Sequence, residues 1–152
     1  MYLPYIITII VCLVFSAFFS GSEISFNTAN KSRLKKSAEA GSKTAQIAYK
    51  TTENFTATLS AILIGNNLAN IAASTCATVI FVKAFAQYSI GDESLASFLS
   101  TLSLTVIVLI FCEIIPKVIC KKYADKVARA VVIPIKVITY VLYPLVFIVT
   151  AF

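Results

Sequence analysis

The sequence predicts an all-α integral membrane protein with three transmembrane helices and additional amphipathic helices on the cytoplasmic side. Hydrophobic residues make up 59% of the 152 residues, charged residues only 13%, and the mean hydropathy is +0.88. Soluble domains are about 45–50% apolar and about 25% charged. The apolar residues form long runs, and the basic residues fall mostly between these runs. We therefore expect residues 1–152 to form a single domain in a lipid bilayer.

The first span is predicted at 5–26. Its apolar stretch, 5–19, is short for a crossing, which takes about 20 residues, so the span must include 20–25. No basic residue precedes it and no clear cleavage site follows, which favours a retained helix over a signal peptide. The connection 28–55 contains six Lys or Arg residues, with Gly41 near its middle. This pattern predicts two short amphipathic juxtamembrane helices that are separated at Gly41.

The second span is predicted at 56–82 and is interrupted by the polar run 65–70. A short connection containing Gly91 follows, and then the third span at 95–119, which is interrupted by Glu113 and Pro116. The last region, 121–152, begins with amphipathic spacing, and its final part, 131–152, is apolar with two prolines and a lysine. Its apolar part, 131–152, is long enough for a fourth span, but its composition also suits a broken helix at the interface.

The basic residues predict the orientation. Six lie in 28–55, six lie between Lys117 and Lys136, and only Lys83 lies between the second and third spans. The positive-inside rule places both rich regions in the cytoplasm. We therefore expect a multi-pass plasma-membrane protein with its N-terminus outside, three crossings before Lys121 and a cytoplasmic C-terminus.

Several function classes are disfavoured. The chain has no histidine, and its four cysteines have no CxxC spacing, which excludes the usual zinc and haem ligand sets and suggests cysteines that serve in packing. The net charge of +6 does not indicate nucleic acid, because the basic residues form no aromatic-laced patch. No convincing pair of base and nucleophile is present, so we do not expect an enzyme.

Polar residues recur at helical spacing inside the first two spans. Ser16, Ser20 and Glu23 are spaced i, i+4 and i+7, which places them on one face of the first span. Asn66 and Asn70 share a face of the second span, and polar groups at such depth call for an explanation. The structural alternatives are serines that bond the carbonyl one turn back, asparagines that hydrogen-bond between helices, and a glutamate that only caps its span.

Glu113 lies deep in the third span, where a carboxylate is a functional-site hypothesis by default. Pro116 either makes a routine kink or leaves the Cys112 carbonyl free beside Glu113. Gly65 either allows close helix packing or breaks its helix so that a backbone carbonyl points at the site. At about 1.5 Å per residue these groups fall at similar depths, between the midplane and the cytoplasmic side. Such oxygen donors suit Mg²⁺, Ca²⁺, Mn²⁺ or Na⁺ rather than zinc or copper.

Three runs together resemble the transmembrane domain of the CNNM/CorC family of Mg²⁺ transporters. They are SAFFSGSE at 16–23, IGNNLAN at 64–70 and EIIPK at 113–117, and the resemblance covers about 3–152. It implies a homodimer with three transmembrane helices per subunit and a belt of cytoplasmic-side helices, to which 121–152 then belongs. It also implies Mg²⁺ export coupled to Na⁺ entry. The cation ligands carried over by matching residues are Ser16, Ser20, Asn66, Asn70 and Glu113, with Gly65 or a nearby carbonyl as a further donor.

Family members usually continue into a cytosolic CBS-pair module that binds nucleotide and a small C-terminal domain. Neither is found among these 152 residues, so we assign no nucleotide site to them. The alternative function is a non-transporting cation sensor or membrane anchor that regulates attached cytosolic domains. Binding and transport need the same ligands, so the sequence leaves both open. It also leaves open the preference among Mg²⁺, Mn²⁺ and Co²⁺, and which of Asn66, Asn67 and Asn70 ligate directly.

Overall fold

The computed structural model describes residues 2–88 and 92–150, and within these ranges it contains helices and no strand. This confirms the predicted all-α fold. Gly91 of the predicted second connection and residues 151–152 of the predicted belt lie outside the described residues. In chain order the helices are α1 (Leu3–Thr28), α2 (Lys31–Glu39), α3 (Lys43–Glu53), α4 (Phe55–Tyr88), α5 (Glu93–Ile107), the π-helix η1 (Val108–Ile114), α6 (Ile115–Lys122), α7 (Ala124–Val141) and α8 (Tyr143–Thr150).

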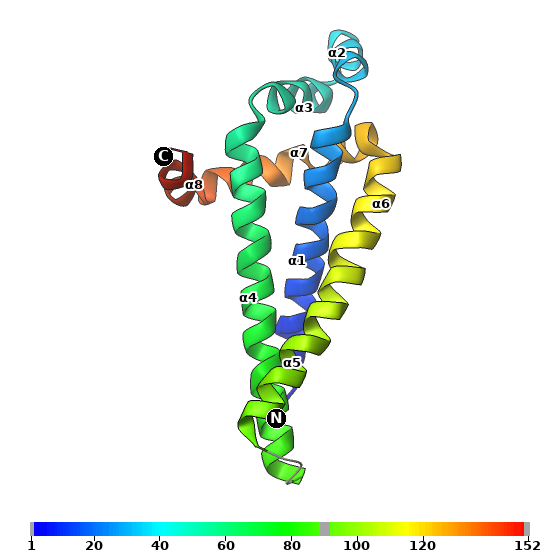
Figure 1. Ribbon diagram of the computed structural model, residues 1–152. Coiled ribbons are helices and arrows are strands. Elements are labelled where there is room, and N and C mark those ends of the chain that lie inside the picture. The colour runs from blue at the N-terminus through cyan, green and yellow to red at the C-terminus, as the bar shows by residue number, and fades with distance from the viewer. Residues whose placement is uncertain (1, 89–91, 151–152) are drawn as a thin grey trace.

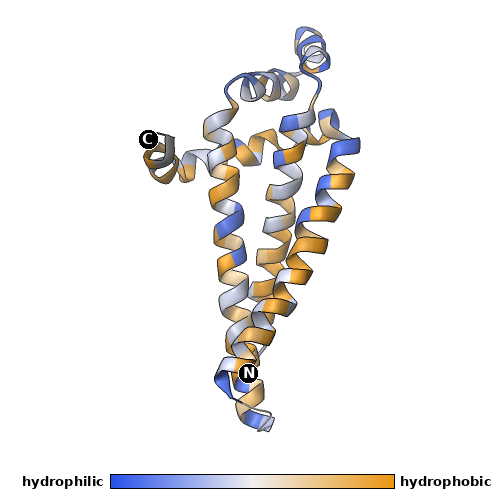
Figure 2. Ribbon diagram, in the orientation of Figure 1, coloured by the Kyte–Doolittle hydropathy of each residue, from blue (hydrophilic) through white to orange (hydrophobic). Residues whose placement is uncertain are grey.

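Three helices are long and apolar enough to cross a membrane, as predicted. They are α1 with 26 residues, α4 with 34, and the continuous helix formed by α5, η1 and α6 with 30. At about 1.5 Å per residue these lengths correspond to about 39, 51 and 45 Å, against about 30 Å of bilayer hydrocarbon. Figure 2 shows apolar residues along these helices, hydrophilic segments towards their ends, and hydrophilic turns part-way along α4.

The spans converge at one end of the molecule and separate at the other. In Figure 1, α1 lies between α4 and the third span, and α4 and α5 approach each other near the N-terminus. The short helices α2 and α3 lie at the opposite end, together with α7 and α8, which run across the bundle rather than along it. We call this the basic end, because α2, α3, α6 and α7 carry most of the lysines and arginines.

Local signals explain the two helices between the first and second spans. The Asn30 side chain accepts a hydrogen bond from the Arg33 N–H at 3.1 Å and caps the start of α2. The Ser42 hydroxyl accepts from the Ala45 N–H at 3.3 Å and caps α3. Between them Gly41 has φ +95°, a left-handed conformation that glycine adopts without steric cost. The chain therefore turns at Gly41, where the sequence predicts the break.

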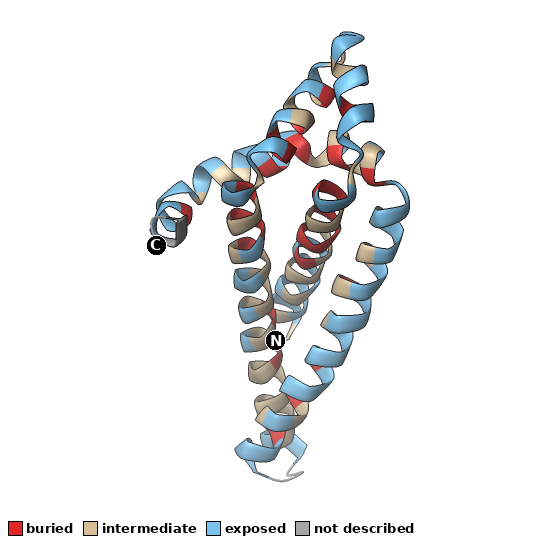
Figure 3. Cartoon of the chain, turned by 45° about the horizontal axis from the view of Figure 1, so that its top comes forward, coloured by how far each residue is buried: buried red, intermediate tan, exposed pale blue. Residues whose placement is uncertain are grey.

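A buried apolar core lies at the basic end. Phe19 and Phe26 of α1, Leu34 of α2, Ile62 of α4 and Val132 of α7 belong to it, and each is at most 5% exposed. Figure 3 shows buried residues gathered in the part of α1 nearest this end, whereas the outer faces of the spans are exposed. Because the exposed faces are apolar, lipid is the solvent that suits them, and the core attaches the short helices to the ends of α1 and α4.

Two local expectations change. The polar run 65–70 does not interrupt α4, which continues from Phe55 to Tyr88, because the polar groups are on side chains and the backbone keeps its helical hydrogen bonds. Near Pro116 the structure has a π-helix rather than a simple kink. The Ile115 N–H donates to the Ile110 carbonyl, five residues back, so the wider turn precedes the proline that cannot donate.

Candidate cation site

The serines of α1 fall into two kinds by their hydrogen bonds. Ser22 and Ser25 each donate to the carbonyl one turn back at 2.7 Å, as small packing residues in membrane helices do. Ser16 instead donates to the Asn66 side-chain oxygen of α4 at 2.7 Å. The Ser20 hydroxyl is buried and has no hydrogen-bond partner among the described residues. The two serines with predicted ligand roles are therefore the two that do not bond back to their own helix.

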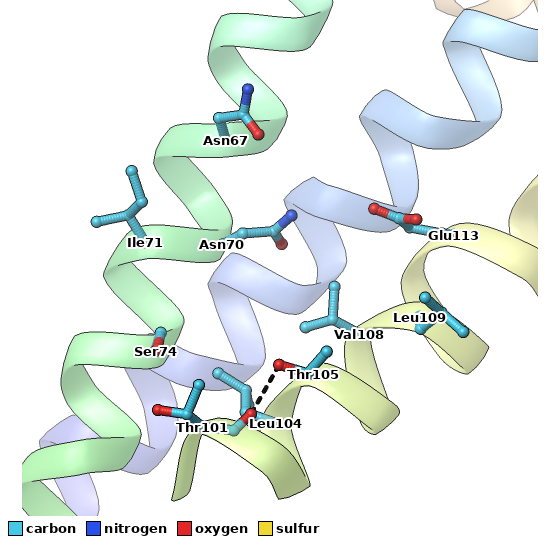
Figure 4. Close-up of a pocket in the computed structure, with 10 residues that line it drawn as sticks. All are labelled: Asn67, Asn70, Ile71, Ser74, Thr101, Leu104, Thr105, Val108, Leu109 and Glu113. Atoms are coloured by element: carbon cyan, nitrogen blue, oxygen red, sulfur yellow. Dashed lines mark hydrogen bonds between the residues drawn. The ribbon is translucent and has the colours of Figure 1, made fainter. Parts of the chain in front are cut away.

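Asn70 and Glu113 line one cavity of about 350 Å³ between α4 and the third span. Figure 4 shows the Asn70 amide and the Glu113 carboxylate pointing towards one another across it. The Asn70 side-chain oxygen is buried and has no hydrogen-bond partner among the described residues. A buried polar atom left unpaired costs free energy, typically about 1–3 kcal/mol, so the Asn70 oxygen would gain from a ligand that enters this cavity. The remaining lining residues are Asn67, Ile71, Ser74, Thr101, Leu104, Thr105, Val108 and Leu109.

The π-helix η1 carries Glu113 and the buried Cys112. Wider π turns of this kind occur frequently at functional sites, because they rotate the residues that follow relative to a regular helix. Glu113 lies nine residues before the end of α6 at Lys122, or about 14 Å along the helix, which places it within the hydrocarbon core of a bilayer. The sequence predicts a disturbed helix here but does not predict its form.

Gly65 faces the aromatic ring of Phe19. A Cβ atom added at Gly65 would lie 2.5 Å from Cζ of that ring, closer than side chains approach. Because α4 is continuous here and Phe19 is only 5% exposed, the structure favours the packing alternative for Gly65 over a helix break. The glycine lets α1 and α4 approach each other beside Ser16, Ser20 and Asn66.

Glu23 forms an ion pair with Lys117 of α6, with its carboxylate 3.2 Å from Nζ. The side chains are 24% and 39% exposed, respectively. The pair joins α1 to the third span on the basic side of the predicted ligands, three residues after Ser20 and four after Glu113. Glu23 is thus neither a free cap of its span nor a member of the Asn70 cavity.

The structure places four of the predicted side-chain ligands in two pairs, and Ser20 belongs to neither. Ser16 and Asn66 are joined by a hydrogen bond, Asn70 and Glu113 share a cavity, and no hydrogen bond in the described chain links the two pairs. Within residues 2–88 and 92–150 no three His, Cys, Asp or Glu residues come close enough to hold a metal. A cation here would therefore be held by hydroxyl and amide oxygens with a single carboxylate, a set that suits hard cations.

Two threonines that line the cavity lie outside the predicted ligand set. Thr101 and Thr105 lie twelve and eight residues before Glu113, so the four positions 101, 105, 109 and 113 repeat at i+4 along one helix face. That spacing is the signal that would have identified them. Each hydroxyl donates to a carbonyl one turn back, at 3.0 and 2.7 Å, which leaves its oxygen lone pairs available to the cavity.

Comparison with known proteins places the chain in a family. It matches the CNNM model, described as the Cyclin M transmembrane N-terminal domain, over residues 7–152. A UPF0053 protein of Haemophilus influenzae is 40% identical over 146 residues, which cover 96% of this chain and 33% of that protein. The UPF0053 inner membrane protein YfjD of Escherichia coli is 39% identical over 113 residues, covering 74% and 25%.

A chloroplastic DUF21 domain-containing protein of Arabidopsis thaliana is 31% identical over 134 residues, covering 88% of this chain and 19% of that protein. The chain thus spans a third or less of the length of these relatives. The family match and the three apolar helices agree with the resemblance carried by the three sequence runs. This chain is a membrane protein and belongs to the CNNM transmembrane-domain family.

Proposed function

We propose that this domain binds Mg²⁺ inside the bilayer and transports it across the membrane. The observation that carries the proposal is the cavity that Glu113 and Asn70 both line, in which the side-chain oxygen of Asn70 has no hydrogen-bond partner among the described residues. A charge at this depth costs about 2.5–3.5 kcal/mol on insertion scales, so a cation partner accounts for its presence. The buried Ser20 hydroxyl and the Ser16–Asn66 pair on the neighbouring helices supply the further oxygen donors.

The chemistry of the site favours a small hard cation that gives up part of its water. Mg²⁺ takes six oxygens near 2.0–2.1 Å and dehydrates reluctantly, so it needs fixed oxygen ligands and a negative charge. Glu113 supplies the charge, and in a low-dielectric site its attraction for a divalent cation is far stronger than in water. The proposed ligands are Ser16, Ser20, Asn66, Asn70 and Glu113, and Thr105 is a candidate outer ligand.

The proposed direction is export by alternating access, coupled to Na⁺ entry, in a homodimer of the plasma membrane. The distribution of basic residues supports a cytoplasmic basic end and an external N-terminus. In this arrangement Mg²⁺ enters from the basic end and leaves towards the end where α4 and α5 converge. The π-helix beside Glu113 is a point at which the third span can change its geometry.

The binding step is tested with Glu113→Gln, which removes the charge and keeps the shape. We expect loss of Mg²⁺ binding in calorimetry, while the variant keeps the oligomeric state and the helix content of the wild type. Glu93→Gln is the matched control, because Glu93 is an exposed carboxylate in the first turn of α5. Unchanged Mg²⁺ affinity in Glu113→Gln, or an equal loss in the control, would refute the site.

The alternative is a cation sensor that does not transport. The buried core at the basic end is the observation that favours a sensor. Because α1 and α4 share this core with α2, α3 and α7, a movement of either span would be transmitted to the short helices. The two functions differ in flux rather than in binding. Mg²⁺ uptake into liposomes that contain the full-length protein, with and without a Na⁺ gradient, separates them: a transporter gives flux that Glu113→Gln abolishes, whereas a sensor gives none.

A further inference from the structure

A second cavity, of about 470 Å³, lies at the basic end and away from the cation site. It is formed where α1 ends, α2 begins and α6 turns into α7. Half of its ten lining side chains are long and basic. The lining residues are Thr28, Asn30, Arg33, Lys121, Lys122, Tyr123, Ala124, Asp125, Lys126 and Arg129.

The positive charge of this cavity is only partly neutralised within the chain. Asp125 is its one carboxylate, and it is already engaged: Oδ2 lies 3.6 Å from an Arg33 nitrogen, and Oδ1 accepts from the Asn30 N–H at 2.7 Å. No carboxylate of the described chain lies within ion-pair distance of the other four basic side chains. These are Lys121, Lys122, Lys126 and Arg129.

One of these four is also held in place. Nε of Arg129 donates to the backbone carbonyl of Asp125 at 3.3 Å, which orients the guanidinium on the first turns of α7. A fixed guanidinium with several lysines around it is the arrangement that binds phosphate, because the planar fork gives directional hydrogen bonds and the ammonium groups add charge. The cavity therefore suits a phosphate-bearing anion.

The position of the cavity indicates where that phosphate comes from. The third span is 30 residues long, or about 45 Å, which equals the thickness of a bilayer with its headgroups, about 40–45 Å. Its last residues, Lys121 and Lys122, therefore lie at headgroup level. One turn earlier, Val118 and Ile119 are 66% and 55% exposed, so an exposed apolar surface precedes the lysines of the cavity on the same helix.

We propose that this cavity binds the phosphate of an anionic phospholipid in the cytoplasmic leaflet. The headgroup lies among Lys121, Lys122, Lys126 and Arg129, and the acyl chains lie along the apolar face of α6. A soluble phosphate would gain nothing from Val118 and Ile119, whereas a lipid uses both the charge and the apolar border. Tyr123, which lines the cavity and is 49% exposed, is the kind of aromatic residue that occurs at this interface.

The test compares two variants that each lose three positive charges. The cavity variant replaces Lys121, Lys122 and Lys126 with Gln. The control variant replaces Lys35, Lys43 and Lys50, exposed lysines of α2 and α3 that do not line the cavity. Delipidated full-length protein is titrated with phosphatidylglycerol or phosphatidylcholine at low salt, and bound lipid is counted by native mass spectrometry.

We expect the wild type and the control variant to bind phosphatidylglycerol in preference to phosphatidylcholine, and the cavity variant to bind it roughly tenfold or more weakly. Replacing the same three lysines with Arg should restore binding. If the triple variant does not fold, Lys126→Gln is compared with Lys43→Gln in its place. Equal binding of the two lipids, or an equal loss in the control variant, overturns the proposal. Displacement of the lipid by millimolar inorganic phosphate overturns the lipid assignment and indicates a soluble anion.

Discussion

Gly65→Ala tests the close contact between α1 and α4 that surrounds the candidate ligands. The new Cβ would lie 2.5 Å from Cζ of Phe19 and 2.9 Å from both Cε atoms, so the ring must move. Phe19 has little freedom to do so, because it is 5% exposed and its ring lies 5.7 Å from that of Phe18 and 6.3 Å from that of Phe15.

The expected magnitude is a balance of two terms. Overpacking a close-packed site costs about 1–3 kcal/mol, whereas replacing a mid-helix glycine with alanine returns about 1 kcal/mol of helix propensity. We therefore expect Gly65→Ala to destabilise the domain by about 0–2 kcal/mol. It should also weaken Mg²⁺ binding, because Phe19 lies between the turns of α1 that carry Ser16 and Ser20.

The assay is a double-mutant cycle in detergent micelles, with denaturant unfolding followed by circular dichroism. In the Phe19→Leu background the smaller side chain relieves the clash, so Gly65→Ala should become neutral or stabilising there. The coupling energy between the two positions should fall at about 0.5–3 kcal/mol, the range for residues in contact. A coupling energy near zero, or a wild-type background in which Gly65→Ala stabilises by the full propensity term, would refute the close approach of these helices.

Two further predictions follow from the hydrogen bonds and ion pairs of α1. Ser16→Ala should weaken Mg²⁺ binding in calorimetry, because it removes the hydrogen bond from α1 to Asn66 of α4. Ser22→Ala loses only a hydrogen bond within its own helix and should leave the Mg²⁺ affinity unchanged. Equal effects of the two substitutions would contradict the ligand assignment. Lys117→Gln should lower the free energy of unfolding by less than about 1 kcal/mol, since its ion pair with Glu23 is partly exposed. A double variant that exchanges the two residues, Glu23→Lys with Lys117→Glu, should restore the thermal midpoint. A larger loss that this exchange does not restore would show that Lys117 has another partner.

The spans were predictable because lipid imposes long apolar runs, and the basic residues at one end predicted which segments lie together there. Composition and spacing also predicted the turn at Gly41, where a left-handed conformation is needed. These features depend on local sequence. The placement of α7 across the bundle is different, because the apolar length of 131–152 alone also allowed a fourth span.

Features that depend on contacts between distant residues were not predictable in detail. The periodicity of α1 grouped Ser16 with Ser20, but the bond from Ser16 to Asn66 depends on how α1 and α4 are rotated against each other. The π-helix also escaped prediction, because Pro116 is compatible with either a kink or a wider turn. The sequence did not identify Thr105 as a cavity residue, because its position there depends on the path that the third span takes past α4.

The pairing of Glu23 with Lys117 could not be derived from the sequence either, since the two residues are 94 positions apart and nothing local links them. The proposed role of Gly65 as a ligand shows the same limit. The residue type allowed both a helix break and close packing, and only the position of Phe19 on the neighbouring helix distinguishes them.

The central claim is that a divalent cation binds where Glu113 faces Asn70. The most direct measurement is an experimental structure of the protein crystallised with Mn²⁺, which is visible by its anomalous scattering and takes the same kind of oxygen ligands as Mg²⁺. We predict one strong peak in this cavity within about 2.0–2.3 Å of a Glu113 oxygen, with an Asn70 or serine oxygen as a second ligand, and no such peak in Glu113→Gln. A Glu113 carboxylate bound only to protein groups at saturating Mn²⁺, or a peak that persists in the variant, would contradict the account.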